Sequence, residues 1–425
     1  MCNGAGVCRK KTGGTMCPSY MGTLDERHST RGRGNALRLA ITGQLGSGGT
    51  PAWEDAETAK TLDLCLSCKA CKTECPSNVD IARLKAEYTA QRFRRSGVPL
   101  ATQILGQTRA LGRLASLTPR LANAMNTSRP GRWVINRVLG IDPRRSIPAF
   151  SEPLPRLPRR SGIRFVGRPS GKRPAVALFG DCFSMFNEPG IGIAAGRVLT
   201  HLGYEVVLAD RGCCARPMIS MGMLEQAIST ADRTVERLRP LLDDPCVRAI
   251  VVLEPSCLSA FKDDWLKLKM AAPLELRRKL ASKAMLVEDF VEREWESHPR
   301  RHEPDPSEKD PGLGPVILHG HCHQKALWGV ETSARLLGRL VGPRLRVLDS
   351  GCCGMAGAFG FAPERYELSM KIGELTLLPA VREAGSEGQI AAPGTSCRHQ
   401  IHDGAGAAAL HPIEIAAQVM CGSGD

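Results

Sequence analysis

The N-terminal fold is decided by the stretch Cys65-Leu-Ser-Cys68-Lys-Ala-Cys71-Lys-Thr-Glu-Cys75-Pro76. Its cysteines are separated by two, two and three residues, and a proline follows the last one. On a tight loop, three thiolates at this spacing wrap one face of a cubane iron–sulfur cluster, while the fourth cysteine binds the other cluster of a two-cluster domain. Zinc sites more often pair two separated Cys-x2-Cys hooks. We therefore interpret the motif as an iron–sulfur site.

A second cysteine motif lies upstream, with the spacing Cys2-x5-Cys8-x8-Cys17 and a proline directly after it. The middle position of this motif is Ala5, whose methyl group cannot bind iron. Exchange of the fourth ligand between the two motifs predicts one [4Fe-4S] cluster on Cys65, Cys68, Cys71 and Cys17. A second site would be formed by Cys75, Cys2 and Cys8. With three thiolates, this second site is a three-iron cluster, a cubane completed by a ligand other than cysteine, or absent.

The C-terminal half contains an internal repeat in which apolar, strand-like runs alternate with helix-like runs. Each copy has one cysteine after its first strand, two adjacent cysteines after its second and one after its third. The gaps between them are 30 and 42 residues in the first copy and 29 and 43 in the second. The alternation is typical of βαβ units with a parallel sheet, and the matching gaps indicate a duplicated domain.

The repeated cysteines all follow predicted strands, and the carboxyl ends of parallel strands meet at one edge of a sheet. We therefore expect two metal sites, one on Cys182, Cys213, Cys214 and Cys257 and one on Cys322, Cys352, Cys353 and Cys397. Soft thiolates suit further iron–sulfur clusters or zinc. Four histidines flank the second set as candidate ligands or hydrogen-bond partners of ligands, namely His319, His321, His323 and His399. The two remaining cysteines, Cys246 and Cys421, are interpreted as structural.

The expected fold class is a multidomain α+β protein. Residues 1–95 should form an α-helical, ferredoxin-type 4Fe-4S domain with helices over 34–45 and 79–94. Residues 96–171 should form a basic, helical and proline-rich linker, because apolar residues recur at helical spacing between 98 and 141. Two α/β cysteine-rich domains with βαβαβ parallel sheets are then expected at 172–295 and 312–425, joined by a linker rich in Pro, Asp and Glu over 296–314.

Composition is that of an ordinary soluble chain. Of its 425 residues, 42% are apolar and 24% charged, and there is neither an apolar run of membrane-spanning length nor a signal-peptide pattern after Met1. Seventeen cysteines without an export signal favour metal ligation over disulfides, because the cytosol keeps thiols reduced. The expected location is therefore the cytoplasm.

Positive charge is concentrated between Arg92 and Arg173. Eighteen Lys and Arg stand there against Asp142 and Glu152, an excess of sixteen charges that is larger than the +14 of the whole chain. This segment is a solvated linker, or a docking surface for an acidic protein or for anionic lipid headgroups. Peripheral attachment to the inner face of a membrane is compatible with it. Sparse aromatic residues and the lack of a recognition motif argue against nucleic acid.

Together these motifs resemble the C-terminal, iron–sulfur half of the FAD-linked oxidase family, which includes D-lactate, glycolate and D-2-hydroxyglutarate dehydrogenases. The two repeats are similar to the cysteine-rich CCG domains of the heterodisulfide-reductase type. The matching phrases span nearly the whole chain: CNGAGVCRK, GTMCPSY, ERHSTRGRGNALRLAITGQL, CLSCKACKTECPSNVD, GDCF, RGCCARP, LEPSC, HGHCHQKAL, GCCGMAGAFGF and PGTSCRHQI.

The resemblance implies an iron–sulfur electron-transfer subunit or module of an FAD-dependent 2-hydroxyacid dehydrogenase of the D-lactate or glycolate type. FAD would lie on a partner chain or an upstream domain, and electrons would leave to a quinone, a cytochrome or another carrier. The sequence starts one residue before its first predicted ligand, as a separate subunit, a fragment or a misplaced start codon would. The alternative is a thiol/disulfide oxidoreductase like heterodisulfide reductase, but each repeat ends in one cysteine where that signature has Cys-x2-Cys.

Overall fold

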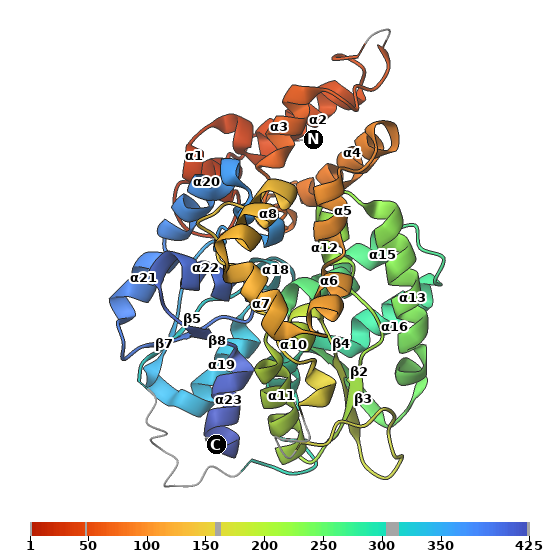
Figure 1. Cartoon of the computed structure of the whole chain (residues 1–425), viewed down its shortest axis with the longest axis vertical. Helices are drawn as coiled ribbons and strands as arrows, with labels where there is room; N and C mark the ends of the chain where they lie inside the picture. Colours follow the sequence, from red (N-terminus) through yellow and green to blue (C-terminus); the bar gives the residue numbers. More distant parts are fainter. Residues whose placement is uncertain (1, 47–48, 158–162, 303–313, 423–425) are drawn as a thin grey trace.

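The computed structural model describes residues 2–46, 49–157, 163–302 and 314–422. A helical N-terminal part is followed by a layer of short helices and then by two parallel four-stranded sheets with helices around them (Figure 1). The fold class expected from the sequence is confirmed. The predicted linker between the repeats lies partly outside the described residues, because 303–313 are among those not described.

The N-terminal helices begin at polar capping residues. Ser29, Asp55 and Asp80 each accept a hydrogen bond from the backbone of the first helical turn. The helices predicted over 34–45 and 79–94 are present, the first shifted toward the N-terminus because Ser29 caps it. The elements of this part are η1 (Val7–Arg9), α1 (Pro18–Thr23), η2 (Glu26–His28), α2 (Thr30–Ile41), α3 (Ala56–Asp63), η4 (Ala70–Lys72) and α4 (Ile81–Ser96).

The predicted linker is helical but broken into short pieces. Pro119 and Pro130 lie in the first turns of two of its helices, where proline is tolerated because no intrahelical partner for its nitrogen is needed. A further short turn, η5 (Leu154–Arg156), leads towards the first sheet. The four helices are α5 (Leu100–Gly106), α6 (Thr108–Ala115), α7 (Pro119–Thr127) and α8 (Arg129–Leu139).

The first sheet has the order β2-β1-β3-β4, with all neighbours parallel. Its central strand is fully buried, as the continuous apolar run of its sequence predicts. The strands are β1 (Ala175–Phe179), β2 (Glu205–Ala209), β3 (Val247–Val252) and β4 (Ala284–Leu286). The helices are α10 (Cys182–Phe186), α11 (Pro189–His201), α12 (Arg216–Ser220), α13 (Leu224–Asp243), α14 (Pro255–Ser259), the π-helix η6 (Ala260–Asp264), α15 (Trp265–Lys267), α16 (Leu274–Lys283) and α17 (Val287–Arg293).

The second sheet repeats this topology as β6-β5-β7-β8, again parallel throughout. Its strands are β5 (Val316–Leu318), β6 (Leu345–Val347), β7 (Gln389–Ala391) and β8 (Ala409–Leu410). Its helices are α18 (Cys322–Leu327), α19 (Glu331–Val341), η8 (Gly342–Arg344), η9 (Gly357–Phe361), α20 (Pro363–Glu374), α21 (Leu377–Ala384), α22 (Thr395–Ala405) and α23 (Pro412–Cys421). The edge strands β4 and β8 were not expected from the sequence.

The two repeats are joined by a shared apolar core. Val176 and Val198 of the first copy belong to the same buried cluster as Leu336 and Ile413 of the second. Helix α11 packs against α23, and α17 against α19. The repeats are therefore packed into one body, and this packing fixes how their sheet edges face one another. Within the described ranges, no helix combines the length and apolarity needed to cross a membrane.

Candidate metal centres

The N-terminal site is a cavity lined by four cysteines, Cys17, Cys65, Cys68 and Cys71, with an empty volume of about 320 Å³. Cys17 is the residue that precedes α1, and the other three lie on the loop that leads into η4. Ser67 and Lys69 in this loop have positive φ angles of 53° and 64°. These left-handed residues coil the loop tightly. The structure thus brings together the four residues that ligand exchange between the motifs predicts.

The polar surroundings of this cavity suit a negatively charged group. Arg33 is buried, and its guanidinium donates to Ser19 Oγ at 2.6 Å. Burial raises the pKa of Cys17 to about 11, against the opposing effects of the Arg33 charge and of the hydrogen bond with Thr30. Burial likewise raises the pKa of Cys71 to about 12. A metal centre must displace these protons when it binds. Four soft thiols around one cavity, backed by a buried cation, fit an iron–sulfur cluster.

The three cysteines assigned to a second N-terminal site are less closely grouped. Cys8 is buried in the apolar core of this domain, and Cys75 packs against the same core. Cys2 is exposed, with its Sγ 3.4 Å from the backbone nitrogen of Gly4. Glu74 ties the two motifs together, because its carboxylate accepts hydrogen bonds from the backbone of the segment just before Cys17. Cys8 and Cys75 are thus neighbours in the core, while Cys2 lies at the surface.

In the first repeat, the four cysteines form a row of sulfur atoms at the carboxyl edge of the sheet. Cys182 Sγ lies 3.8 Å from Cys213 Sγ, and Cys214 Sγ lies 3.0 Å from Cys257 Sγ. Cys213 and Cys214 are in contact with each other, which completes the row. All four thiols are buried. Trp265 donates its indole N–H to the carbonyl oxygen of Cys214 at 3.1 Å, which holds the paired cysteines in place.

The second repeat has the same order of sulfur contacts. Cys322 contacts Cys352, and Cys353 contacts both Cys352 and Cys397. The hydrogen bond from Cys352 is the main cause that lowers the pKa of Cys322 to about 6. In the parts of the chain that are described, no three His, Cys, Asp or Glu side chains converge as the ligands of a single metal ion do. The cysteines predicted for each repeat are nevertheless adjacent in space.

The histidines around the second site differ in their ring contacts. His321 caps α18 by accepting the backbone N–H of the residue two positions on. His399 Nε2 lies 2.9 Å from the carbonyl oxygen of Ser146. His319 Nδ1 lies 2.7 Å from Ser350 Oγ, but its buried Nε2 has no hydrogen-bond partner within the described residues. His319 also lies near Cys353. An orphaned ring nitrogen beside the sulfur row makes His319 the candidate histidine that best fits a ligand role.

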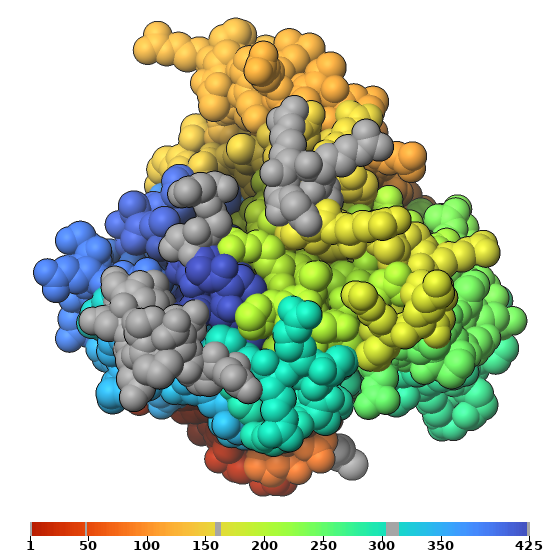
Figure 2. All heavy atoms as spheres, turned by 90° about the horizontal axis from the view of Figure 1, so that it is seen from below, coloured from red at the N-terminus to blue at the C-terminus, as the bar shows by residue number. Residues whose placement is uncertain are grey.

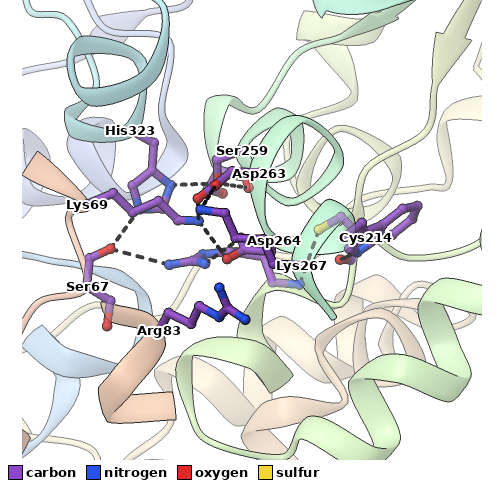
Figure 3. A network of polar contacts seen from close by, with 12 residues as sticks. Ser67, Lys69, Arg83, Cys214, Ser259, Asp263, Asp264, Lys267 and His323 are labelled. Carbon is purple, nitrogen blue, oxygen red and sulfur yellow. Dashed lines mark hydrogen bonds and ion pairs between the residues drawn. The ribbon is translucent and has the colours of Figure 1, made fainter. Parts of the chain in front are cut away.

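The cysteine loop of the N-terminal domain docks between the two repeats (Figure 3). His323 Nε2 of the second repeat lies 3.0 Å from the carbonyl oxygen of Ser67, and His323 Nδ1 lies 3.0 Å from Ser259 Oγ of the first repeat. Arg216 also donates to the Ser67 carbonyl oxygen, at 3.3 Å. One buried imidazole therefore connects all three cysteine-bearing parts of the molecule.

Buried ion pairs hold the same loop on the first repeat. Lys69, whose side chain is 1% exposed, donates to Asp263 at 2.7 Å and to Asp264 at 2.6 Å. Arg216 pairs with Asp264 at 2.9 Å. The cationic neighbours of Asp263, Lys69 foremost, hold the pKa of that carboxyl well below its usual range despite burial. Both aspartates lie at the end of the π-helix η6, whose widened turn is a common device at functional sites. The sequence carried no signal for this cluster.

The N-terminal site and the second CCG site are direct neighbours. After burial, the charge of Cys322 is the strongest influence that raises the pKa of Cys68. Leu66, Cys322 and Cys352 belong to one buried cluster, with Cys68 packed against its edge. Two sulfur sites that are about 250 residues apart in the chain thus share a boundary.

Comparison with known proteins agrees with this architecture. A family model described as "4Fe-4S dicluster domain" matches residues 1–80, and one described as "Cysteine-rich domain" matches residues 176–262. A relative from Escherichia coli K12, the C-type subunit of anaerobic glycerol-3-phosphate dehydrogenase, is 28% identical over 352 residues, which cover 81% of this chain and 83% of the relative.

Two further relatives extend the comparison. The glycolate oxidase iron-sulfur subunit of E. coli K12 is 26% identical over 415 residues, covering 95% of this chain and 91% of the relative. The D-2-hydroxyglutarate dehydrogenase of Pseudomonas putida KT2440 is 24% identical over 455 residues, covering 98% of this chain but 43% of the relative. This chain therefore spans less than half the length of that enzyme.

These relatives are components of dehydrogenases and of an oxidase, which does not favour the thiol/disulfide oxidoreductase alternative. The resemblance stated from the sequence is confirmed at the level of its domains. Residues 1–80 are a 4Fe-4S dicluster domain and residues 176–262 a cysteine-rich domain, in a chain related to the iron–sulfur subunits of dehydrogenases.

Proposed function

We propose that this chain is the iron–sulfur electron-transfer subunit or module of an FAD-dependent 2-hydroxyacid dehydrogenase. FAD is held by a partner chain or by a domain outside this sequence, and the final acceptor is a quinone, a cytochrome or another carrier. The observation that carries the proposal is the close grouping of the three predicted sets of cysteines, two of which share a boundary at Cys68 and Cys322. The similarity to iron–sulfur subunits of two such enzyme systems supports it.

Cys17, Cys65, Cys68 and Cys71 would hold a [4Fe-4S] cluster, which supplies one-electron chemistry. Arg33 offsets part of the negative charge of the thiolates, and the coiled loop through Ser67 and Lys69 holds three of them on one side. Cys75, Cys2 and Cys8 would hold the second, three-thiolate site. The two sets in the repeats would hold further iron–sulfur clusters or zinc, with His319 beside the second set.

The contacts of the cysteine loop suggest an order of transfer. Cys68 lies beside Cys322, while the contacts of the loop with the first repeat pass through the ion pairs of Lys69 and Arg216. We therefore infer that electrons on the N-terminal site pass first to the second CCG site. The docking hydrogen bonds of His323 keep the two sulfur groups at a constant separation. The corresponding domain limits are 1–95, 96–171, 172–295 and 312–425.

Oxygen-free purification tests this function. The expected material contains iron and acid-labile sulfide and gives an EPR signal after reduction. Cys68→Ser should lose the signal of the N-terminal site, whereas Cys246→Ser should keep it, because Cys246 lies at the start of β3 and away from the sulfur groups. Stoichiometric zinc without a reducible cluster would sink the proposal.

A further inference from the structure

The helices α5 to α8 have their apolar residues on the outside. Their inner faces carry small residues: a Cβ at Gly106 would lie 2.5 Å from Met223 Sδ, and one at Gly112 would lie 2.8 Å from the Phe186 ring. A surface helix normally turns its apolar stripe inward. Here the large apolar side chains are 37–68% exposed, and they are Leu100, Leu111, Leu114, Leu117, Leu121, Met125, Trp133, Val134 and Val138.

This helical layer is firmly attached to the body. Arg109 donates to the carbonyl oxygen of Gly180 at 2.7 Å and pairs with Asp210. The side chain of Asn123 both donates to and accepts from the backbone of Phe150 at 2.8 Å. In Figure 1 the four helices cross in front of the two sheets, and in Figure 2 the same orange segment stands out at the upper edge. The exposed apolar surface is therefore held in place by specific contacts.

The charge on this surface has one sign. Residues 100–141 contain six arginines and no Asp, Glu or Lys. Arg109 and Arg132 are used to anchor the layer. The other four are exposed, and within the described residues none of them forms an ion pair with an acidic side chain. They are Arg113, Arg120, Arg129 and Arg137.

We propose that the outer faces of α6, α7 and α8, here called the apolar–arginine face, bind the surface of an anionic lipid membrane. Protruding leucines and an exposed tryptophan suit the boundary between headgroups and acyl chains, where Trp is enriched. Arginines beside them can extend to lipid phosphates while their stems stay apolar. A protein interface of ordinary composition has a mixed polar rim. An arginine-only rim matches the single sign of charge on an anionic leaflet better than it matches a folded protein.

Membrane binding by this face would bring the chain to the phase in which a quinone acceptor dissolves. It extends the proposed electron-transfer function but does not depend on cluster content. A failure of one is therefore distinguishable from a failure of the other: iron and sulfide analysis reports on the clusters, and vesicle binding reports on the face.

The test uses the full chain, purified without oxygen, and sedimentation with vesicles. Binding is expected with phosphatidylglycerol mixed into phosphatidylcholine, not with phosphatidylcholine alone, and it should weaken at high salt. Combined Leu114→Ser, Leu117→Ser and Leu121→Ser should weaken binding by more than about tenfold. Arg113→Gln with Arg120→Gln should weaken it by about fivefold per arginine. The matched control, Leu375→Ser with Arg237→Gln, changes exposed residues outside the face and should leave binding unchanged.

Fluorescence gives a second readout. Trp133 is 68% exposed, so its emission should shift to shorter wavelength when anionic vesicles are added, and the shift should be lost in Trp133→Phe. The proposal is overturned if the wild type does not bind anionic vesicles at low salt, or if the leucine variant binds as well as the wild type. It is also overturned if a purified flavoprotein partner, and not the vesicles, shifts the Trp133 emission, because the face would then be a protein interface.

Discussion

The imidazole Nε2 of His323 lies 3.0 Å from the backbone carbonyl oxygen of Ser67. A carbonyl oxygen accepts, so this nitrogen carries the hydrogen, and in the neutral ring Nδ1 accepts from the hydroxyl of Ser259. Burial lowers the pKa of His323 well below its usual value, which keeps the ring neutral near pH 7. The residue after Cys322 thus fixes the residue before Cys68. Two sulfur sites are held together by a directional bond between buried groups.

Replacing His323 with Phe should keep the ring volume but remove both hydrogen bonds. The buried Ser259 hydroxyl and the Ser67 carbonyl oxygen each lose a partner, so the free energy of unfolding should fall by about 1–3 kcal/mol. Urea unfolding followed by circular dichroism measures this change. His402 is 66% exposed and serves as control, since His402→Phe should stay within about 0.5 kcal/mol of the wild type. Equal stability of the two variants would show that the His323 bonds do not hold the domains together.

The loop after the paired cysteines should respond oppositely in the two repeats. Gly354, directly after Cys353, has φ +93°, and an added Cβ would overlap the backbone carbonyl oxygen of Ser369. Gly354→Ala should therefore destabilise the chain by about 2 kcal/mol or more. At the same place in the first repeat, Ala215 already has φ +58°. Ala215→Gly should change stability by less than about 1 kcal/mol, because relief of strain offsets the lost methyl contact. Thermal unfolding of both variants decides this, and a harmless Gly354→Ala would contradict the described loop.

Acid should destabilise the protein through His411. This residue caps α23, its Nε2 donates to the carbonyl oxygen of Leu253 at 2.9 Å, and burial lowers its pKa from 6.5 to about 3. The unfolded chain then binds the proton more readily, so the stability is complete above pH 6.5. It should fall by about 1.4 kcal/mol per unit as the pH drops from 6.5 towards 3.

The His411→Asn variant separates this proton from other acid effects. Asparagine can still accept the backbone N–H of Ile413 as a helix cap, but it does not titrate. Denaturant unfolding between pH 4 and 7 should show a slope smaller by one proton in the variant. An unchanged slope would mean that His411 is not the buried, neutral group described here.

Alkaline pH should destabilise the protein through Glu288. This side chain is fully buried in α17, and burial, followed by the charge of Asp289, raises its pKa from 4.5 to about 8. Its stabilising neutral form is complete below pH 4.5 and is lost as the pH rises towards 8, at about 1.4 kcal/mol per unit. Glu288→Gln should remove that decline and be the more stable protein at pH 8. Unfolding free energies at pH 5 and pH 8 give the comparison, and a variant less stable at both would refute it.

Much of the architecture can be predicted from residue order alone. The spacing of Cys65, Cys68 and Cys71 reflects local loop geometry, so the addition of Cys17 to their cavity follows from one general rule of two-cluster domains. Cysteines that follow parallel strands meet because of sheet topology, which short-range alternation of strands and helices already specifies. The strands β4 and β8 escaped prediction because two or three residues are too few for a periodic pattern.

What the tertiary structure alone decided is how these parts meet. Lys69 and Asp263 are 194 residues apart, and neither belongs to a motif, yet they form a buried ion pair. The neighbourhood of Cys68 and Cys322, the orphaned Nε2 of His319 and the outward leucines of α6 and α7 likewise depend on which surfaces pack together. Such contacts arise from shape and burial between distant segments. They leave no periodicity in the sequence, because each residue meets its partner only after both domains have folded.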